Sequence, residues 1–368
     1  MNAMGVDRRL LLNVDWGMLL AALLLAAVGV ATILSATYAS PRLGGLYVKQ
    51  LVAVGLGLLA LVISISVDYR RLADRSPLLY LVALGALVAL LVLGPVKANT
   101  KRWFVIGGFQ IQPSEFAKLV AALFVAKIFA EFKKDSLSLM DILWPGAAVG
   151  LMAVLIAAEP DLGTAITLVP LLLVVAFLAG LRLRAILGGA LIMVVLGGLA
   201  WMFALADYQK ARIYSFLDPN LDPRGSGYQK IQSQIAVGSG RVTGKGYMEG
   251  SQSRLGYLPA RHTDFIFSVL AEEKGFVGVA VVLGLYLFVL WRALETAQLA
   301  RDRVGAFLAA GLAAMLAFQV VYNVAMVAGL VPVKGLPLPL MSYGGSSVLS
   351  SLIAVGLILN VRMRRFAN

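Results

Sequence analysis

The sequence contains no cysteine, a single histidine and few charged residues. Of its 368 residues, 14% are charged and 60% are hydrophobic. The absence of cysteine excludes disulfides, thiolate nucleophiles and cysteine-ligated zinc or iron–sulfur sites, and one histidine cannot supply a site with several histidine ligands. Soluble domains average about 25% charged residues. This composition therefore indicates that lipid covers much of the chain, and we expect an all-α, polytopic integral membrane protein.

Long apolar runs set the number of membrane spans. A helix needs about 20 residues to cross the hydrocarbon core of a bilayer. A tenth candidate, 113–132, has the right length and apolarity but contains Glu115, Lys118 and Lys127. We therefore predict ten transmembrane helices in a single domain, residues 1–368. The nine runs without charge are 16–41, 50–67, 76–96, 142–158, 162–181, 185–206, 275–291, 304–333 and 335–361.

The positive charge supports this count. The chain has 32 Lys and Arg against 19 Asp and Glu, a formal net charge of +13. With ten spans, most loop Lys and Arg residues fall on one side, which the positive-inside rule assigns to the cytoplasm. We expect both termini in the cytoplasm and membrane lipids as partners. No run of like charge is long enough to indicate binding of nucleic acid.

One connection is much longer than the others and is expected outside the cytoplasm, at about 207–263. Its centre places Tyr228, Ile231 and Ile235 on one helical face, with Gln and Ser on the others. This pattern is typical of a short amphipathic helix on a membrane or cavity surface. A helix packed only on its own loop fits the pattern equally well.

Charged side chains at membrane depth are costly and usually face the interior of the bundle. Glu115 and Lys118 are three residues apart, so they share a helical face and can form either a structural ion pair or the wall of a polar cavity. Before them, Lys101, Arg102 and Trp103 form a basic pair beside an aromatic residue. Such a group is most often a membrane-edge anchor, and binding of a phosphate group is the alternative.

Two further segments carry acidic residues at expected helix starts. Asp161 follows Glu159 and Pro160 in a very short loop, and its spacing favours an N-cap. Asp264 precedes an apolar run, so an N-cap is its default role as well, and His262 beside it is typical of a packed residue. Asp264 is expected at the extracytoplasmic edge of the membrane, next to a loop rich in basic residues, and this location would also suit binding of an anionic lipid headgroup.

Near the C-terminus, the pattern predicts non-helical backbone at membrane depth. Ser342 and Tyr343 are followed by Gly344 and Gly345, with prolines upstream. Backbone of this kind is tolerated only where it is buried in protein or lines a cavity. It occurs in transporters as well, so it does not by itself separate an enzyme from a carrier.

Taken together, these motifs resemble the SEDS family (shape, elongation, division and sporulation). The C-terminal signature comprises Asn323, Gly329, Pro332 and Gly335, then Leu-Met-Ser-Tyr-Gly-Gly-Ser-Ser at 340–347. The motifs at 101–103, 112–118, 159–163 and 261–267 match in the same order, so the resemblance covers about residues 15 to 362. The long loop is closer to the elongation members of the family than to the division members. Arg241 departs from the pattern, which usually has glycine there.

The resemblance implies a peptidoglycan glycosyltransferase that polymerises lipid II outside the membrane for cell-wall elongation, with a class B penicillin-binding protein as transpeptidase partner. It puts the essential aspartate at Asp264, which we expect to act as general base. A divalent cation, Mg²⁺ or Mn²⁺, is a further expectation. The residues expected to bind substrate are Lys101, Arg102, Trp103, Glu115, Lys118, Asp161, Arg212, Lys245, His262, Thr263 and Ser342.

Two other functions fit the same pattern of spans and charges. A lipid II flippase or other transporter would also need ten spans, a broken helix and a charged cavity. A non-catalytic scaffold that recruits a penicillin-binding protein through its eighth and ninth spans is the second alternative.

Overall fold

Helices make up nearly all of the structure, a computed structural model that describes residues 13–40, 43–95, 101–106, 109–132, 134, 136–203, 210, 214–222 and 225–366. Within these residues, ten helices have 17 or more residues, and they match the ten predicted spans in order. The expected all-α fold is confirmed. The helices are α2 (Trp16–Thr37), α3 (Leu46–Ser66), α5 (Ser76–Leu93), α6 (Pro113–Glu131), α7 (Leu139–Ala158), α8 (Leu162–Leu178), α9 (Leu183–Phe203), α13 (Ile266–Gln298), α14 (Arg303–Val327) and α15 (Gly345–Met363).

Seven of these helices are long and apolar enough to cross a membrane by length and composition alone: α2, α3, α5, α7, α13, α14 and α15. Helix α8 is apolar but shorter, with 17 residues. Helix α6 contains four charged residues, yet most of its side chains are buried. Of these, Glu115 and Lys118 are buried and face protein, as membrane-embedded ionisable groups usually do, whereas Lys127 and Glu131 near the end of the helix are more exposed.

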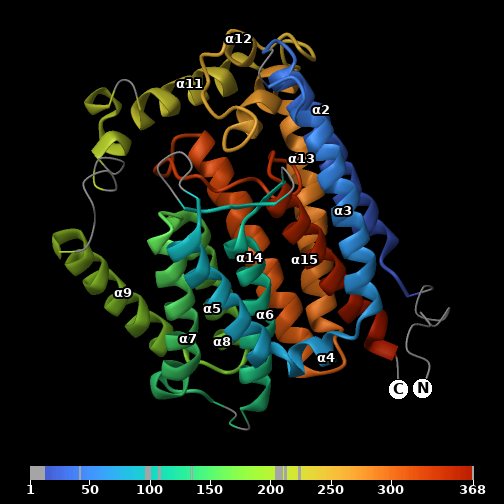
Figure 1. Ribbon diagram of the computed structural model, residues 1–368, viewed down its shortest axis with the longest axis vertical. Helices are drawn as coiled ribbons and strands as arrows, with labels where there is room; N and C mark the ends of the chain where they lie inside the picture. The colour runs from blue at the N-terminus through green and yellow to red at the C-terminus, as the bar shows by residue number, and fades with distance from the viewer. Residues whose placement is uncertain are drawn as a thin grey trace.

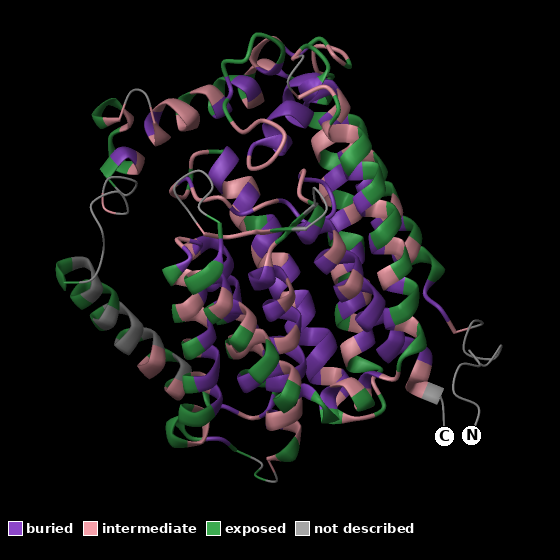
Figure 2. Cartoon of the chain, in the orientation of Figure 1, coloured by how far each residue is buried: buried purple, intermediate pink, exposed green. Residues whose placement is uncertain are grey.

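Burial within the bundle is uneven (Figure 2). Nearly every residue of α15 is buried, whereas much of α5 is exposed, including Leu78, Leu81 and Val82. Large exposed apolar side chains are unfavourable in water but ordinary against lipid tails. The outer helices thus present the lipid-facing surface, and α14 and α15 form the protein interior.

The first and last long helices meet at one end of the bundle (Figure 1). Asp15, the N-cap of α2, accepts a hydrogen bond from Met18 N at 3.0 Å. The same carboxylate lies 3.3 Å from Arg362 near the end of α15 and 2.6 Å from Arg292 on α13. Because α2 starts where α15 ends, the chain crosses the bundle an even number of times, in agreement with ten spans.

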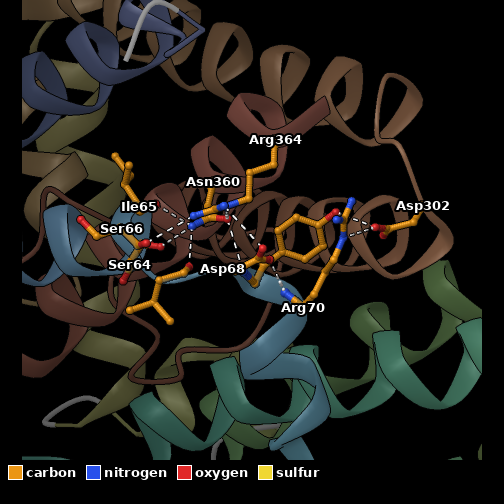
Figure 3. Close-up of polar contacts among 10 residues, drawn as sticks. Ser64, Ile65, Ser66, Asp68, Arg70, Asp302, Asn360 and Arg364 are labelled. Carbon is orange, nitrogen blue, oxygen red and sulfur yellow. Dashed lines mark hydrogen bonds and ion pairs between the residues drawn. The ribbon is translucent and has the colours of Figure 1, made fainter. Parts of the chain in front are cut away.

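The same end is closed by a polar network around Asn360 (Figure 3). The amide nitrogen of Asn360 donates to the carbonyl oxygens of Ser64, Ile65 and Val67 at 2.8, 2.7 and 2.6 Å. These carbonyls end α3, where the last turn of a helix leaves acceptors without intrahelical partners. One buried side chain of α15 therefore caps α3 and fixes it beside α15.

A second part of this network connects α4 (Tyr69–Asp74) to the start of α14. Tyr69 Oη and Arg70 Nε donate to the carboxylate of Asp302 at 2.8 and 2.6 Å. Asp302 is also the N-cap of α14 and accepts from Gly305 N at 2.7 Å. The network thus joins α3, α4, α14 and α15 at the end where the termini of the bundle meet (Figure 3).

Short elements cover the opposite end. A two-stranded hairpin, β1 (Phe104–Ile106) and β2 (Phe109–Ile111), pairs Phe104 with Ile111; it precedes α6. The predicted short helix in the long loop is α11 (Ser226–Ser239), which lies across the ends of α13 and α14 (Figure 1). The remaining short elements are η1 (Pro219–Leu221), α12 (Ser251–Arg254) and, at the other end, η2 (Arg364–Phe366).

Helix α11 packs through its small residues, since its buried positions are Gly227, Ser233 and Ala236. Ser233 is fully buried and bonds to the hydroxyl of Ser268 at 2.9 Å and to Val327 O at 2.8 Å. The apolar side chains of Ile231 and Ile235 point away from this contact, with exposed fractions of 38% and 44%. The amphipathic helix is therefore confirmed, and its apolar face is not the one packed on the bundle.

Helix α13 differs from the prediction, because it begins at Ile266 and is broken at Gly275, where the eighth span was expected to start. Gly275 has φ 60° and ψ −160°, a backbone conformation that side chains disfavour. The broken helical bonds are replaced by bonds to the loop at 241–246: Phe276 N and Val277 N donate to the carbonyls of 241 and 242, and the carbonyls of 272 and 273 accept from the amides of 245 and 246.

This inserted loop explains the strained backbone of Arg241. Its φ is 48°, in the left-handed region that favours glycine. The resemblance expects glycine at this position, and the loop keeps its shape with arginine because its backbone is paired to both halves of α13.

Candidate active site

Asp264 lies in a loop segment whose backbone is held by the C-terminal motif. His262 O accepts from Tyr343 N at 2.9 Å, and Thr263 O accepts from Ser342 Oγ at 2.6 Å. Asp264 O accepts from the side-chain amide of Asn323 at 3.0 Å. Three successive carbonyls are thus fixed by donors from α14 and from the segment before α15.

The donors are themselves held in place by buried amides. Asn323 is fully buried and also donates to Leu336 O at 2.9 Å. Gln50 on α3 donates to Ser342 O at 3.0 Å and accepts from Gly344 N at 3.2 Å. The sequence reasoning missed Gln50. The signal it offered was a lone amide side chain in the first turns of an apolar helix.

A cavity of about 370 Å³ opens beside this segment. Asp264 and Thr263 form one wall, the hairpin and the starts of α6 and α8 form another, and α3 with the first turn of α15 forms a third. The structure therefore brings together half of the residues that the sequence pointed to: Arg102, Trp103, Glu115, Asp161, Thr263 and Asp264.

The predicted non-helical segment lines the cavity, with Gly335, Pro337, Tyr343 and Gly344 among its walls. A Cβ atom on Gly335 would lie 3.4 Å from the carboxylate of Asp264. Because residue 335 is glycine, no side chain at this position fills the space in front of the Asp264 carboxylate. The break between α14 and α15, expected from the glycines and prolines, is confirmed.

Glu115 and Lys118 form an ion pair with 3.1 Å between Nζ and the carboxylate, and both side chains are at most 4% exposed. Glu115 also accepts from Ser350 Oγ at 2.6 Å and reaches the cavity surface. The two alternatives drawn from the sequence are therefore compatible: the pair is structural, and one of its members forms part of the cavity wall.

Asp161 has the predicted capping role and a second one. It caps α8 through Thr164 N at 3.2 Å and Thr164 Oγ1 at 2.8 Å. It also accepts from Gln112 Nε2 at 2.7 Å, which ties the loop before α6 to the loop before α8. Arg102 completes this wall, because its guanidinium donates to the carbonyls of Glu159, at 3.0 Å, and Pro160.

Burial of this acidic loop changes its protonation. Desolvation raises the pKa of Glu159 to about 8, with a further increase from Asp161 and an opposing effect of Arg102. Both carboxyl oxygens of Glu159 are buried without a hydrogen-bond partner in the described structure. Burial raises the pKa of Asp161 as well, and Arg102 opposes this increase.

His262 and Ser342 do not line the cavity, but they pack against the segments that do. Burial, with a smaller effect of Arg261, lowers the pKa of His262 and favours its neutral form. Its ring centre lies 5.6 Å from that of Tyr343, so it is a packed residue, as its type suggested. Ser342 bonds to Thr263 O and to Leu338 N, and it shapes the segment without lining the cavity.

The other predicted ligands lie elsewhere. Lys101 Nζ donates to Leu91 O at 2.9 Å at the end of α5, which fits the anchoring alternative. Lys245 pairs with the fully buried Glu272 at 2.7 Å and stabilises the loop inserted into α13. Arg212 lies outside the described residues.

This chain is similar to known proteins along most of its length. A family model described as "Cell cycle protein" for FtsW, RodA and SpoVE matches residues 15–366. The peptidoglycan glycosyltransferase MrdB of Escherichia coli is 37% identical over 327 residues, 87% of this chain and 86% of its own length. The stage V sporulation protein E of Bacillus subtilis is 40% identical over 318 residues, 85% of this chain and 86% of its own length.

Solved structures share the fold. One, described as "Structural coordination of polymerization and crosslinking by a peptidoglycan synthase complex", has a TM-score of 0.83 at 37% identity and covers 96% of this chain and 99% of its own. The rod shape determining protein RodA of Thermus thermophilus has a TM-score of 0.72 at 32% identity, covering 96% and 98%. With a family match over residues 15–366 and relatives of this identity, the chain belongs to the FtsW, RodA and SpoVE family, the SEDS proteins.

Proposed function

We propose that Asp264 is the general base of a peptidoglycan glycosyltransferase whose substrate is lipid II, a disaccharide-peptide carried on undecaprenyl diphosphate. The observation that carries this proposal is the held segment at 262–264, which presents one carboxylate to a polar cavity. The chain is a multi-pass membrane protein and a peptidoglycan glycosyltransferase, and several of its curated relatives carry the second description in their names.

The reaction needs one proton acceptor at the attacking oxygen. In the proposed mechanism, Asp264 takes the proton of the acceptor sugar hydroxyl while that oxygen attacks the anomeric carbon of the donor. The bond from this carbon to the diphosphate oxygen breaks, and the electron pair leaves with undecaprenyl diphosphate. Direct displacement inverts the configuration of the anomeric carbon.

A second carboxylic acid is not required for the leaving group. Inverting glycosidases use such an acid to protonate a poor leaving oxygen, whereas diphosphate departs as a stabilised anion. Electrostatic stabilisation of the developing negative charge can take its place. Arg102 lines the cavity and is a cation suited to this role, and the buried Glu115–Lys118 pair would keep the facing wall rigid.

The expected Mg²⁺ or Mn²⁺ does not fit a site made by the protein alone. Among the described residues, no three His, Cys, Asp or Glu side chains are placed to hold a metal ion. Mg²⁺ is often bound by one or two carboxylates together with substrate phosphates. We therefore propose that an ion, if the enzyme uses one, enters with the diphosphate, and the mechanism above contains no step through it.

The cavity end is proposed to face the extracytoplasmic side, with both termini in the cytoplasm. The support is the distribution of arginine: Arg70, Arg292, Arg362 and Arg364 all take part in ion pairs at the end away from the cavity. The positive-inside rule assigns that end to the cytoplasm. Lipid II polymerisation and the long loop would then share the outer side.

A class B penicillin-binding protein is the proposed partner. The support is the likeness to a solved structure described as a peptidoglycan synthase complex that coordinates polymerization and crosslinking. Polymerised glycan has to be crosslinked by a transpeptidase, so a partner with that activity fits the proposed function.

The proposal is tested by adding lipid II to purified wild-type protein and to Asp264→Asn, then resolving glycan products on a gel. We expect polymer from the wild type and at least a 100-fold loss in the variant, since a positioned base contributes about 10²- to 10⁴-fold. Asp218→Asn, which keeps an N-cap side chain in the same loop, is the matched control and should remain active.

Two results would contradict the proposal. Transfer of lipid II across vesicles by the purified protein, without glycan products, would favour the flippase. Unchanged polymerisation by Asp264→Asn would remove the assigned base.

A further inference from the structure

The cations around the cavity are not equivalent. Among the described residues, the lining contains two, Lys49 and Arg102, and three acids, Glu115, Asp161 and Asp264. Glu115 is paired with the buried Lys118. Arg102 faces Asp161 and has its guanidinium bonded to two carbonyls of the loop before α8. Lys118 is thus paired with a protein carboxylate, and part of the hydrogen-bonding capacity of Arg102 is used by protein carbonyls.

Lys49 is different. Its side chain is exposed, and the structure gives its ammonium no hydrogen bond or ion pair with any described residue. Among the described lining residues, Lys49 is therefore the cation whose ammonium has no hydrogen-bond or ion-pair partner in the protein, so its charge is available to a ligand.

The position of Lys49 is nevertheless well fixed. It precedes Gln50, whose amide holds both Ser342 O and Gly344 N. Ser342 in turn holds Thr263 O, next to Asp264. The turn that carries Lys49 and the segment that carries Asp264 therefore belong to one hydrogen-bonded framework around the cavity.

The chemistry of lipid II decides which phosphate would meet this lysine. In the acceptor, the reacting hydroxyl and the diphosphate lie at opposite ends of the disaccharide. In the donor, the diphosphate is attached to the reacting anomeric carbon itself. A cation that shares a cavity of about 370 Å³ with the base is therefore placed for the donor diphosphate. The first turn of α15 lines the same cavity and adds the partial positive charge of a helix N-terminus.

We propose that Lys49 is a substrate-binding residue that neutralises the diphosphate of the donor, in the ground state and as this group departs. The assignment rests on the proposed function. A charged hydrogen bond contributes about 1.5–3 kcal/mol, so loss of the ammonium should cost about 10- to 100-fold in affinity.

The test measures equilibrium binding of undecaprenyl diphosphate to the purified full-length chain in detergent. Lys49→Met should weaken binding about 10- to 100-fold, and Lys49→Arg should stay within a few-fold of wild type. Uncharged undecaprenol has the same tail, so its binding should not change. Lys230→Met is the control, since Lys230 bonds to Phe216 O in the long loop and does not line the cavity.

Several outcomes would overturn the assignment. Equal affinity of wild type and Lys49→Met for undecaprenyl diphosphate is the first. An equal loss for phosphatidylglycerol would make Lys49 a general lipid anchor. Equal losses in the Met and Arg variants, with lowered melting temperatures, would make its role structural. Polymerisation of lipid II by the wild type is measured in parallel, so failure of the proposed function is seen separately from the binding result.

Discussion

At the residue scale, hydrogen bonds to the backbone matter as much as the charged groups. Asp264 owes its placement to three donors on consecutive carbonyls, one of which is the amide of Asn323. Asn323 and Ser342 stood out in the sequence because they belong to a long, mixed motif. Gln50 and Lys49 did not, because a polar residue near the start of an apolar helix is ordinary at a membrane edge.

Glu159 gives a prediction about pH at this scale. Its pKa, ordinarily 4.5, is raised to about 8 by burial. Between these values the folded protein holds a proton that the unfolded chain releases, so stability falls as pH rises through this window. Glu159→Gln should remove this dependence, raising the melting temperature at pH 8 by a few degrees and leaving it unchanged near pH 4.5.

The measurement is a thermal melt in detergent across that pH range. A variant that melts below wild type at pH 8 would show that the ionised carboxylate stabilises the fold instead. Asp218→Asn, at an exposed cap, is the control and should keep the pH dependence of the wild type.

At the element scale, the sequence predicted where helices lie better than where they break. The ten spans came from apolar length, and α6 was recovered despite its charges because the positive-inside pattern supported a tenth span. Two of those charges, Glu115 and Lys118, share a buried face in the structure. The hairpin β1–β2 was not predicted, since strands of three residues leave no periodicity. The start of α13 was predicted nine residues too late. The charge-free run begins only after Glu272, Glu273 and Lys274, whereas the helix already begins at Ile266 and includes these three residues.

Asn360 gives a prediction for the helix ends. Asn360→Ala would leave three carbonyls at the end of α3 without their donor. Each buried acceptor without a partner costs about 1–3 kcal/mol, so we expect a loss of about 2–4 kcal/mol in total after local relaxation. A reversible unfolding assay in detergent measures this loss, with the exposed Asn220→Ala as control. A loss below about 0.5 kcal/mol would show that the network has no stabilising role.

At the scale of the whole molecule, one end of the bundle carries ion pairs of arginine and the other carries the cavity. Charge bias in the sequence predicted this polarity, because the positive-inside rule gathers basic residues at one end of a membrane bundle. The sequence could not predict the cavity wall in detail. The wall combines residues from six separated segments, and only packing brings them together.

The absence of cysteine allows a direct test of orientation. Single cysteines can be placed at Leu221, exposed in the long loop, and at Arg71, exposed on α4. In intact cells, a membrane-impermeant maleimide should label Leu221→Cys and should label Arg71→Cys only after permeabilisation. The reverse pattern would place the cavity on the cytoplasmic side and contradict the proposed function.

The central claim is that Asp264 accepts a proton in the chemical step, and the most direct measurement is the first-turnover rate at saturating lipid II, taken together with lipid II affinity. We predict that Asp264→Asn binds lipid II within a few-fold of wild type and forms glycosidic bonds at least 100-fold more slowly. A variant that retains the wild-type rate, or that loses binding in proportion to its rate, would contradict the account.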